Sequence, residues 1–218
     1  MDQTEINQKL EEVGAVITDS HFVYTSGKHG RAYVNWAEVL THPFVSWLTT
    51  NKMEDLVWGL NFETIIGPTH TGDKIAYGLA LNFRTGSLPE IHYVYAQESD
   101  GGRVFPRGQD AYVRGKKILI VDDILTTGST IDEVLEAIGS LSGVPVGIVV
   151  GCNRSSFDDS YKGIPLLSLV KVDLEQWEES ECPICKEGIL PREEIGHGKN
   201  FMELYGRDPT SWPANRKR

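Results

Sequence analysis

Apolar residues at helical spacing mark two helices in the first part of the chain. A helix over residues 4–14 is predicted by apolar positions three or four residues apart, at Ile6, Leu10 and Val13. A second amphipathic pattern begins at Pro43, a residue favoured in the first turn of a helix, and predicts a helix from there to about residue 60. Between the two, residues 21–36 alternate apolar and polar positions, which predicts a hairpin or a strand–loop–strand unit.

From residue 63 onward, short apolar runs alternate with helical patterns. Strands are predicted over residues 63–67, 91–96, 116–122, 144–152 and 164–170. Helices are predicted from about Asp73 to residue 81 and over residues 129–141. Continuous runs of Ile, Val and Leu separated by helices are typical of a mainly parallel sheet covered by helices on both faces. The sequence therefore predicts an α/β fold.

Composition and charge narrow the possible functions. The chain has 218 residues, enough for one domain with a sizeable core and a small appendage. Its net charge of -10 argues against nucleic-acid and anionic-membrane partners, because both favour basic surfaces. No apolar run approaches the ~20 residues of a membrane span, and the acidic start of the chain does not resemble a secretory signal. Three cysteines make no disulfide framework, so we expect a cytoplasmic enzyme or binding protein.

The segment "VDDILTTGST" combines two chemistries at the end of one predicted strand. Asp122 and Asp123 can accept hydrogen bonds from sugar hydroxyls. The hydroxyls and backbone N–H groups of residues 126–130 open the next helix, where a phosphate is favoured. Together they suit a ribose 5-phosphate. An ordinary helix cap is the simpler alternative, but it needs only one hydroxyl. A signalling receiver domain would carry such an acidic pair near its N-terminus, and here the pair lies in mid-chain.

Two further loops are expected at the same edge of the sheet, since ligands bind beyond the carboxyl ends of parallel strands. Residues 67–73 join a strand to a helix through "GPTHTG", a second anion site that would suit a pyrophosphate beside the first. Residues 97–110 are mostly polar with three glycines, which predicts a mobile lid whose only cations are Arg103 and Arg107. A surface loop without function is the alternative for this last segment.

The stretch "ILIVDDILTTGST" resembles the phosphoribosyl-pyrophosphate signature of the type I phosphoribosyltransferases. With "FVYTSGKHGRAYVN" and "GPTHTG" before it and "IVVGCNR" after it, residues 13–175 resemble the orotate phosphoribosyltransferase family. The resemblance implies a mainly parallel sheet flanked by helices, with a small hood and a C-terminal extension. It also implies transfer from phosphoribosyl pyrophosphate to orotate, which gives orotidine monophosphate and pyrophosphate, with Mg²⁺ and a homodimer.

The resemblance also implies roles for individual residues. Those for the ribose phosphate would be Asp122, Asp123, Ile124, Leu125, Thr126, Thr127, Gly128, Ser129 and Thr130. The pyrophosphate loop would be Pro68, Thr69, His70, Thr71 and Gly72, and the base would meet Tyr33, Val34, Thr126 and Arg154. The catalytic groups would be Asp122 and Asp123, which stabilise the positive ribose ring, with Arg103 and Arg107 at the leaving group.

The chain departs from the family at several cations. Thr25 and Thr71 stand where the family has lysines, and "AQESDGG" lacks the charged residues of the family's lid. Each such cation could supply about 1.5–3 kcal/mol in charged hydrogen bonds. Nearby replacements are Lys28, Lys74, Arg103 and Arg107. Two interpretations stay open: a transferase for orotate or another base, or a non-catalytic protein that binds phosphoribosyl pyrophosphate or a nucleotide. The paired aspartates favour the first and the depleted lid favours the second.

The last part of the chain carries a CxxC motif in a polar segment. Cys182 and Cys185 resemble half of a zinc knuckle, and zinc needs four ligands. Only Cys152 and His197 offer further ligands on sequence grounds, so Zn²⁺ is not expected and a tight turn is the simpler interpretation. His21, His29 and His42 are predicted to be surface or hydrogen-bonded structural residues. We expect a transferase domain over residues 1–175, with its hood in 1–42, and an extension over 176–218.

Overall fold

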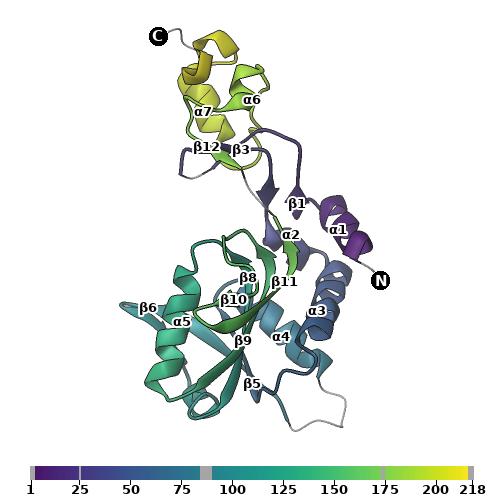
Figure 1. The fold of residues 1–218 in the computed structure, drawn as a ribbon, viewed down its shortest axis with the longest axis vertical. Helices are drawn as coiled ribbons and strands as arrows, with labels where there is room; N and C mark the ends of the chain where they lie inside the picture. Colours follow the sequence, from purple (N-terminus) through teal and green to yellow (C-terminus); the bar gives the residue numbers. More distant parts are fainter. Residues whose placement is uncertain (1–2, 25, 84–89, 173–174, 216–218) are drawn as a thin grey trace. The chain divides into compact units, whose positions relative to one another are not determined.

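The computed structural model describes residues 3–24, 26–83, 90–172 and 175–215. They divide into two compact units, each made from two stretches of chain (Figure 1). The core unit comprises Met1–Leu10 and Trp36–Val172 within the described residues, and the accessory unit comprises Glu11–Asn35 and Asp173–Arg218 on the same basis. The core unit contains one large sheet and the accessory unit contains two small ones.

The core unit is built on a seven-stranded sheet in the order β10-β11-β9-β8-β5-β6-β7. The strands are β5 (Thr64–Pro68), β6 (His92–Ser99), β7 (Gly102–Val104), β8 (Lys117–Leu125), β9 (Val144–Asn153), β10 (Ser160–Tyr161) and β11 (Ile164–Lys171). The five inner strands are parallel, and the edge strands β7 and β10 pair antiparallel with their neighbours. The carboxyl ends of β5, β8 and β9 therefore lie at one edge of the sheet.

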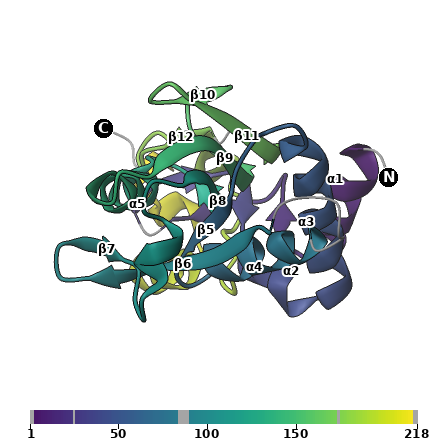
Figure 2. The same ribbon diagram turned by 90° about the horizontal axis from the view of Figure 1, so that it is seen from below.

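Helices cover both faces of this sheet. The core helices are α2 (Trp36–Thr41), α3 (Pro43–Val57), α4 (Gly72–Asn82), α5 (Ser129–Ser140) and the short η1 (Gln109–Tyr112), and α1 (Gln3–Glu12) opens the chain. In Figures 1 and 2, α5 lies on one face and α3 and α4 lie on the other. Helix α5 buries Ile131, Val134 and Ile138, which share one side of a 3.6-residue helix. Because both faces are covered, the middle of β8 is apolar and fully buried.

The predicted fold class is confirmed: the core is a mainly parallel sheet between helices. Strands β5, β6, β8, β9 and β11 and helices α1, α3, α4 and α5 fall at the predicted places in the chain. Residues 97–110 differ from the open loop that the pattern predicted. Strand β6 continues through Ser99 and pairs with β7 across a turn at Gly101 and Gly102, both with φ of 129°. Glycine makes this turn possible because it tolerates positive φ, so most of the polar segment forms a hairpin and η1.

The accessory unit contains two small sheets. Strand β1 (Val16–Ile17) pairs with β4 (Tyr33–Val34), and β3 (His29–Gly30) lies between β2 (Phe22–Val23) and β12 (Gln176–Trp177). Its helices are α6 (Pro183–Lys186), α7 (Gly198–Tyr205), η2 (Pro209–Ser211) and η3 (Pro213–Asn215). Val23 packs with Phe201, Met202 and Trp212 in one apolar cluster. The two stretches of chain thus share both a sheet and a core.

This division differs from the one expected from the sequence, which joined the hood in residues 1–42 to the transferase domain. Glu11–Asn35 instead belongs to the same compact unit as the C-terminal stretch. The physical reason is the pairing of β12 with β3 and the shared apolar cluster. The C-terminal stretch of the accessory unit begins at Asp173, close to the domain boundary expected between residues 175 and 176.

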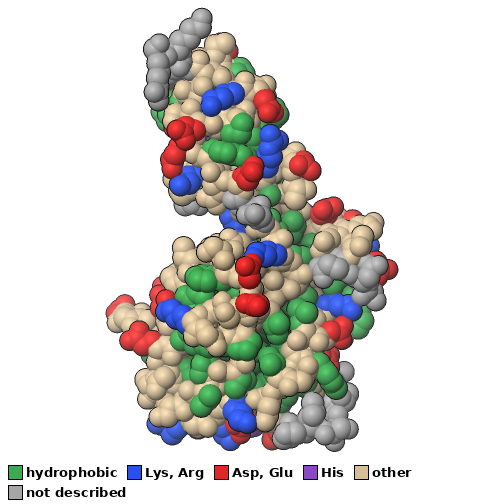
Figure 3. All heavy atoms as spheres, viewed as in Figure 1, with side chains coloured by type: hydrophobic (Ala, Val, Ile, Leu, Met, Phe, Trp, Pro, Cys, Tyr) green, Lys and Arg blue, Asp and Glu red, His purple; other side chains and the backbone are tan. Residues whose placement is uncertain are grey.

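Charges of both signs are distributed over the surface. On the face drawn in Figure 3, acidic and basic side chains lie interspersed on each unit. Within the part of the chain that the structure describes, no helix is both long enough and apolar enough to cross a bilayer.

Candidate functional site

Two aspartates lie near the carboxyl end of β8, the central strand of the core sheet, which continues to Leu125. Strand β8 carries both, and Asp122 is only 6% exposed whereas Asp123 is half-buried. The backbone N–H of Asp123 donates to Asp122 Oδ1 at 2.9 Å, and that of Ile124 donates to Asp123 Oδ1 at 2.7 Å. Each carboxylate is thus held by the backbone of the next residue. The pair is presented at the strand end as the sequence predicted.

The buried carboxyl of Asp122 is electrostatically unusual. Burial raises its pKa well above the ordinary value of an aspartate, and the neighbouring charge of Asp123 raises this pKa further. The hydrogen bond from the Asp123 backbone and the positive charge of Arg103 oppose these effects and are smaller. The negative charge of Asp122 is therefore poorly compensated in the unliganded protein. Hydroxyl donors or a cation arriving with a ligand would stabilise it.

The hydroxyl-rich loop after β8 leads into α5. Thr126, Thr127 and Ser129 are exposed, and Gly128 takes a φ of 89° at the start of the helix, a conformation that favours glycine. The N-terminus of α5 brings its N–H groups and the positive end of its dipole to the same loop. The arrangement suits an anion, with hydroxyl groups around it.

Tyr161 of strand β10 supports this loop. Its hydroxyl lies 2.8 Å from Asp132 Oδ1 and 3.3 Å from the carbonyl oxygen of Gly128. A Cβ at Gly128 would come within 2.2 Å of that hydroxyl, so glycine is needed for contact as well as for φ. Burial, together with the hydrogen bond to Asp132, raises the pKa of Tyr161 to about 12 and keeps its proton in place.

The loop between β5 and α4 meets the aspartates directly. Gly72, the first residue of α4, is buried against the end of β8. A Cβ on Gly72 would lie 2.7 Å from Asp122 Oδ1 and 3.0 Å from the carbonyl oxygen of Val121. The absence of a side chain at Gly72 therefore allows the predicted pyrophosphate loop, residues 68–72, to lie beside the predicted ribose-phosphate loop.

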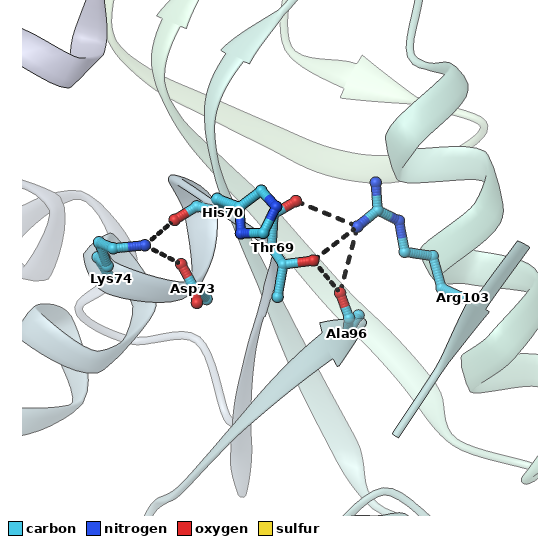
Figure 4. Close-up of polar contacts among 6 residues, drawn as sticks. All are labelled: Thr69, His70, Asp73, Lys74, Ala96 and Arg103. Atoms are coloured by element: carbon cyan, nitrogen blue, oxygen red, sulfur yellow. Dashed lines mark hydrogen bonds and ion pairs between the residues drawn. The ribbon is translucent and has the colours of Figure 1, made fainter. Parts of the chain in front are cut away.

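Arg103 of strand β7 joins three elements around the pyrophosphate loop (Figure 4). Its Nη1 donates to the carbonyl oxygens of Thr69 and Ala96, both at 3.2 Å, and lies 3.4 Å from Thr69 Oγ1. Its Nε donates to Glu133 of α5 at 3.1 Å, and its side chain is only 8% exposed. Arg103 therefore links the loop at Thr69 to the β6–β7 hairpin and to helix α5.

Lys74 approaches the same loop from the other side (Figure 4). Its ammonium group donates to the carbonyl oxygen of His70 and lies 3.2 Å from Asp73 Oδ1. The Lys74 side chain remains 57% exposed, and His70 is exposed as well. An exposed ammonium group at this position can reach an anion held by the loop.

The other predicted site residues are divided between the two units. The backbone N–H of Arg154 donates to the carbonyl oxygen of Leu125 at 2.8 Å, so Arg154 follows β9 directly beside Thr126. Arg107 is exposed, and it is not one of the residues that hydrogen-bond to Arg103. Tyr33 and Val34 form β4 of the accessory unit, where Lys28 forms an ion pair with Glu178. Thr25 lies outside the described residues.

Two supporting residues were not found from the sequence. Glu133, the partner of Arg103, is one of several acidic residues on α5, and Tyr161 lies in a strand of only two residues. Neither has a local pattern that distinguishes it from an ordinary surface residue. Their roles follow from contacts between segments about 30 residues apart, which only the folded chain reveals.

Comparisons with known proteins agree with this geometry. A family model described as phosphoribosyl transferase domain matches residues 48–162. The chain is 32% identical over 185 residues to an orotate phosphoribosyltransferase of Caldanaerobacter subterraneus subsp. tengcongensis, covering 85% of this chain and 91% of that one. It is 30% identical over 189 residues to that of Thermoanaerobacter sp., covering 87% and 95%.

Among solved structures, orotate phosphoribosyltransferase of Mycobacterium tuberculosis H37Rv in complex with Fe(III) dicitrate has the same fold. The TM-score is 0.62 at 20% identity, with 79% of this chain and 97% of that chain covered.

Replacing Asp122 by asparagine should stabilise the unliganded protein at neutral and alkaline pH. The asparagine side chain would keep an acceptor for the Asp123 N–H but cannot ionise. Because the folded-state pKa of Asp122 is raised, the wild-type protein loses stability as pH rises above the unfolded value of about 3.9. The midpoint of thermal unfolding should therefore be higher for Asp122→Asn at about pH 8, with the difference closing near pH 4.

The exposed Asp100→Asn controls for the loss of one negative charge and should change the midpoint little. A midpoint for Asp122→Asn at or below that of the wild type at the higher pH would show that burial of this carboxyl carries no such cost.

Proposed function

The chain belongs to the orotate phosphoribosyltransferase family, and we propose that it transfers the phosphoribosyl group of phosphoribosyl pyrophosphate to orotate. The products are orotidine monophosphate and pyrophosphate. The observation that carries this proposal is the contact of Gly72 with Asp122, since it sets two anion-binding loops on either side of one acidic pair. That spacing suits a sugar with a phosphate at one end and a pyrophosphate at the other.

The aspartates suit the charge that develops on the sugar. As the bond from C1 to the pyrophosphate oxygen breaks, its electron pair leaves with pyrophosphate and positive charge builds on the ribose ring. Asp122 and Asp123 accept hydrogen bonds from the ring hydroxyls and stabilise that charge. Residues 126–130 hold the 5-phosphate at the start of α5. A nitrogen lone pair of orotate then forms the new bond to C1.

The other loop suits the leaving group. Residues 68–72 offer backbone N–H groups, and Lys74 offers an exposed ammonium beside them. Arg103 acts as a positioning residue, because its buried guanidinium is already engaged by Thr69, Ala96 and Glu133. These two cations take over part of the electrostatic stabilisation that the family's missing lysines would supply.

Mg²⁺ carried by phosphoribosyl pyrophosphate fits the donor set. Asp122 and Asp123 are oxygen donors, the type that this hard cation prefers, and the raised pKa of Asp122 indicates that the charge of Arg103 compensates its carboxylate only in part. When bound, the ion would neutralise negative charge on the diphosphate. The protein's own residues hold and orient the sugar and its two phosphate groups.

For the base, Arg154 and Thr126 lie together at the strand ends. The guanidinium of Arg154 suits the carboxylate of orotate, since arginine and carboxylate form paired charged hydrogen bonds. The family resemblance alone assigns Tyr33 and Val34 to the base, and both lie in the accessory unit. An orotate carboxylate distinguishes this substrate from uracil, hypoxanthine and guanine.

We further propose a cytoplasmic homodimer that serves pyrimidine biosynthesis, as membership of the family suggests. The exposed face of α3 supports association: Phe44 is 60% exposed, Trp47 is 56% exposed, and their rings lie 5.9 Å apart. Large aromatic side chains clustered on a surface are typical of protein–protein contacts.

Release of pyrophosphate tests the proposal. With phosphoribosyl pyrophosphate and Mg²⁺ present, we expect release with orotate and none with uracil, hypoxanthine or guanine. Asp123→Asn should lower the rate by about 10²–10³-fold, as removal of an electrostatic group at a reacting centre usually does. Release with none of the bases, combined with tight binding of phosphoribosyl pyrophosphate, would instead establish a binding protein without turnover.

Replacing Arg103 and replacing Arg107 should have different effects on kcat/KM. Arg103→Ala removes the contacts to Thr69 and Glu133, so kcat/KM for phosphoribosyl pyrophosphate should fall about 10–100-fold, the equivalent of about 1.5–3 kcal/mol. Arg107→Ala is the matched control and should leave kcat/KM near the wild-type value. Arg103→Lys should stay impaired, because a lysine cannot reproduce the forked contacts.

A loss that appears mainly in KM would indicate a displaced loop. Equal effects of Arg103→Ala and Arg107→Ala on kcat/KM would contradict the positioning role.

A further inference from the structure

Four metal-ligating side chains meet inside the accessory unit. His21, His29, Cys182 and Cys185 are all fully buried, and one ligand atom from each lies within 4.8 Å of the others. The two histidines come from the N-terminal stretch, beside and within strands β2 and β3, and the two cysteines flank the start of α6. The cluster belongs to the accessory unit, whereas the aspartates and phosphate loops belong to the core unit.

The spacing of the ligand atoms matches the edges of a small tetrahedron. His21 Nε2 lies 2.9 Å from His29 Nδ1, 3.7 Å from Cys185 Sγ and 3.8 Å from Cys182 Sγ, and His29 Nδ1 lies 3.3 Å from Cys185 Sγ. Tetrahedral zinc with ordinary bond lengths requires about 3.4 Å between two nitrogens and about 3.6 Å between nitrogen and sulfur. The side chains need only small shifts to reach these values.

The surroundings orient the lone pair of His21 toward the centre of the cluster. His21 Nδ1 lies 2.6 Å from the carbonyl oxygen of Ile189, which can only accept, so Nδ1 carries the proton and Nε2 presents its lone pair inward. A second hydrogen bond of this kind is what orients histidine ligands in metal sites. The backbone N–H of Cys185 donates to Cys182 Sγ at 3.4 Å, a contact that stabilises a thiolate.

The identity of the four ligands selects the ion. Two sulfurs and two nitrogens in a tetrahedral arrangement are typical of zinc, and four protein ligands leave no position for a substrate. We propose that His21, His29, Cys182 and Cys185 bind one structural Zn²⁺ that joins the N-terminal stretch of the accessory unit to its C-terminal stretch.

A structural ion explains how so small a unit stays folded. One of its apolar clusters packs Val23, Phe201 and Trp212 beside the ligands, and small domains commonly depend on a metal or disulfides. The cysteines are free thiols, so they contribute no disulfide. The ion would link ligands 161 and 164 residues apart in the sequence, in addition to the pairing of β12 with β3.

The sequence pattern offers only Cys152 and His197 as further ligands and therefore does not predict zinc. The structure places Cys152 in β9 of the core unit, and His197 is an exposed residue at the start of α7. The ligands that accompany the cysteines are His21 and His29, which lie in a separate stretch of chain. The sequence could not show that these two histidines are buried and lie next to the two thiols.

Metal analysis of the whole, untagged chain tests the proposal. After dialysis under reducing conditions, mass spectrometry should find about one Zn²⁺ per chain. His29→Ala and Cys185→Ser should each reduce this content to below about one tenth, because three ligands no longer close the site. The matched controls, His197→Ala and Cys152→Ser, should retain the metal. A wild-type chain without metal, or loss of metal from the controls alone, would overturn the proposal.

Two measurements on the wild-type chain cover the case in which the variants do not fold. Removal of the ion by a chelator should lower the midpoint of thermal unfolding, and Zn²⁺ but not Mg²⁺ should restore it. Replacement by Co²⁺ should give the absorption of tetrahedral cobalt with thiolate-to-metal charge transfer. An unchanged midpoint after complete removal of metal, or a cobalt spectrum without thiolate bands, would contradict a structural site. None of these measurements depends on transferase activity.

Discussion

The approach of Gly72 to Asp122 is the contact on which the site depends. Helix α4 begins so close to the end of β8 that a single methyl group at Gly72 would collide with the carboxylate. This closeness places residues 68–72 beside residues 122–130 and allows one ligand to bridge both loops. Arg103 then secures the arrangement from the hairpin side, through Thr69 on one loop and Glu133 on the helix that opens the other.

The same closeness has an electrostatic cost. Asp122 is buried next to a second acid, which raises its pKa and leaves the unliganded protein with a poorly compensated carboxylate. A sugar with hydroxyl donors, accompanied by a divalent cation, supplies what is missing. Functional sites are commonly less stable than they could be, because a group arranged for its ligand is unsatisfied without it. Asp122 is the clearest case in this chain.

Local patterns were enough to predict the five inner strands of the sheet, helices α3, α4 and α5, and the two loops that follow β5 and β8. The runs of Ile, Val and Leu in β8 and β9 predict buried strands. The Thr/Gly/Ser loop after Asp123 predicts a site that favours phosphate. What the sequence could not show depends on distant contacts. Arg103 and Glu133 are charged residues like many others until the hairpin meets α5, and His21 and His29 reveal their role only when the C-terminal cysteines fold against them.

Calorimetric titration of Gly72→Ala with phosphoribosyl pyrophosphate and Mg²⁺ tests the central claim most directly. A methyl group there should push α4 from β8 and separate the two loops, so the affinity should fall at least about tenfold, or 1.4 kcal/mol. Gly139→Ala in α5, where a Cβ meets nothing within 4 Å, is the matched control and should bind as the wild type does. A folded Gly72→Ala protein with unchanged affinity would show that the two loops do not form one site.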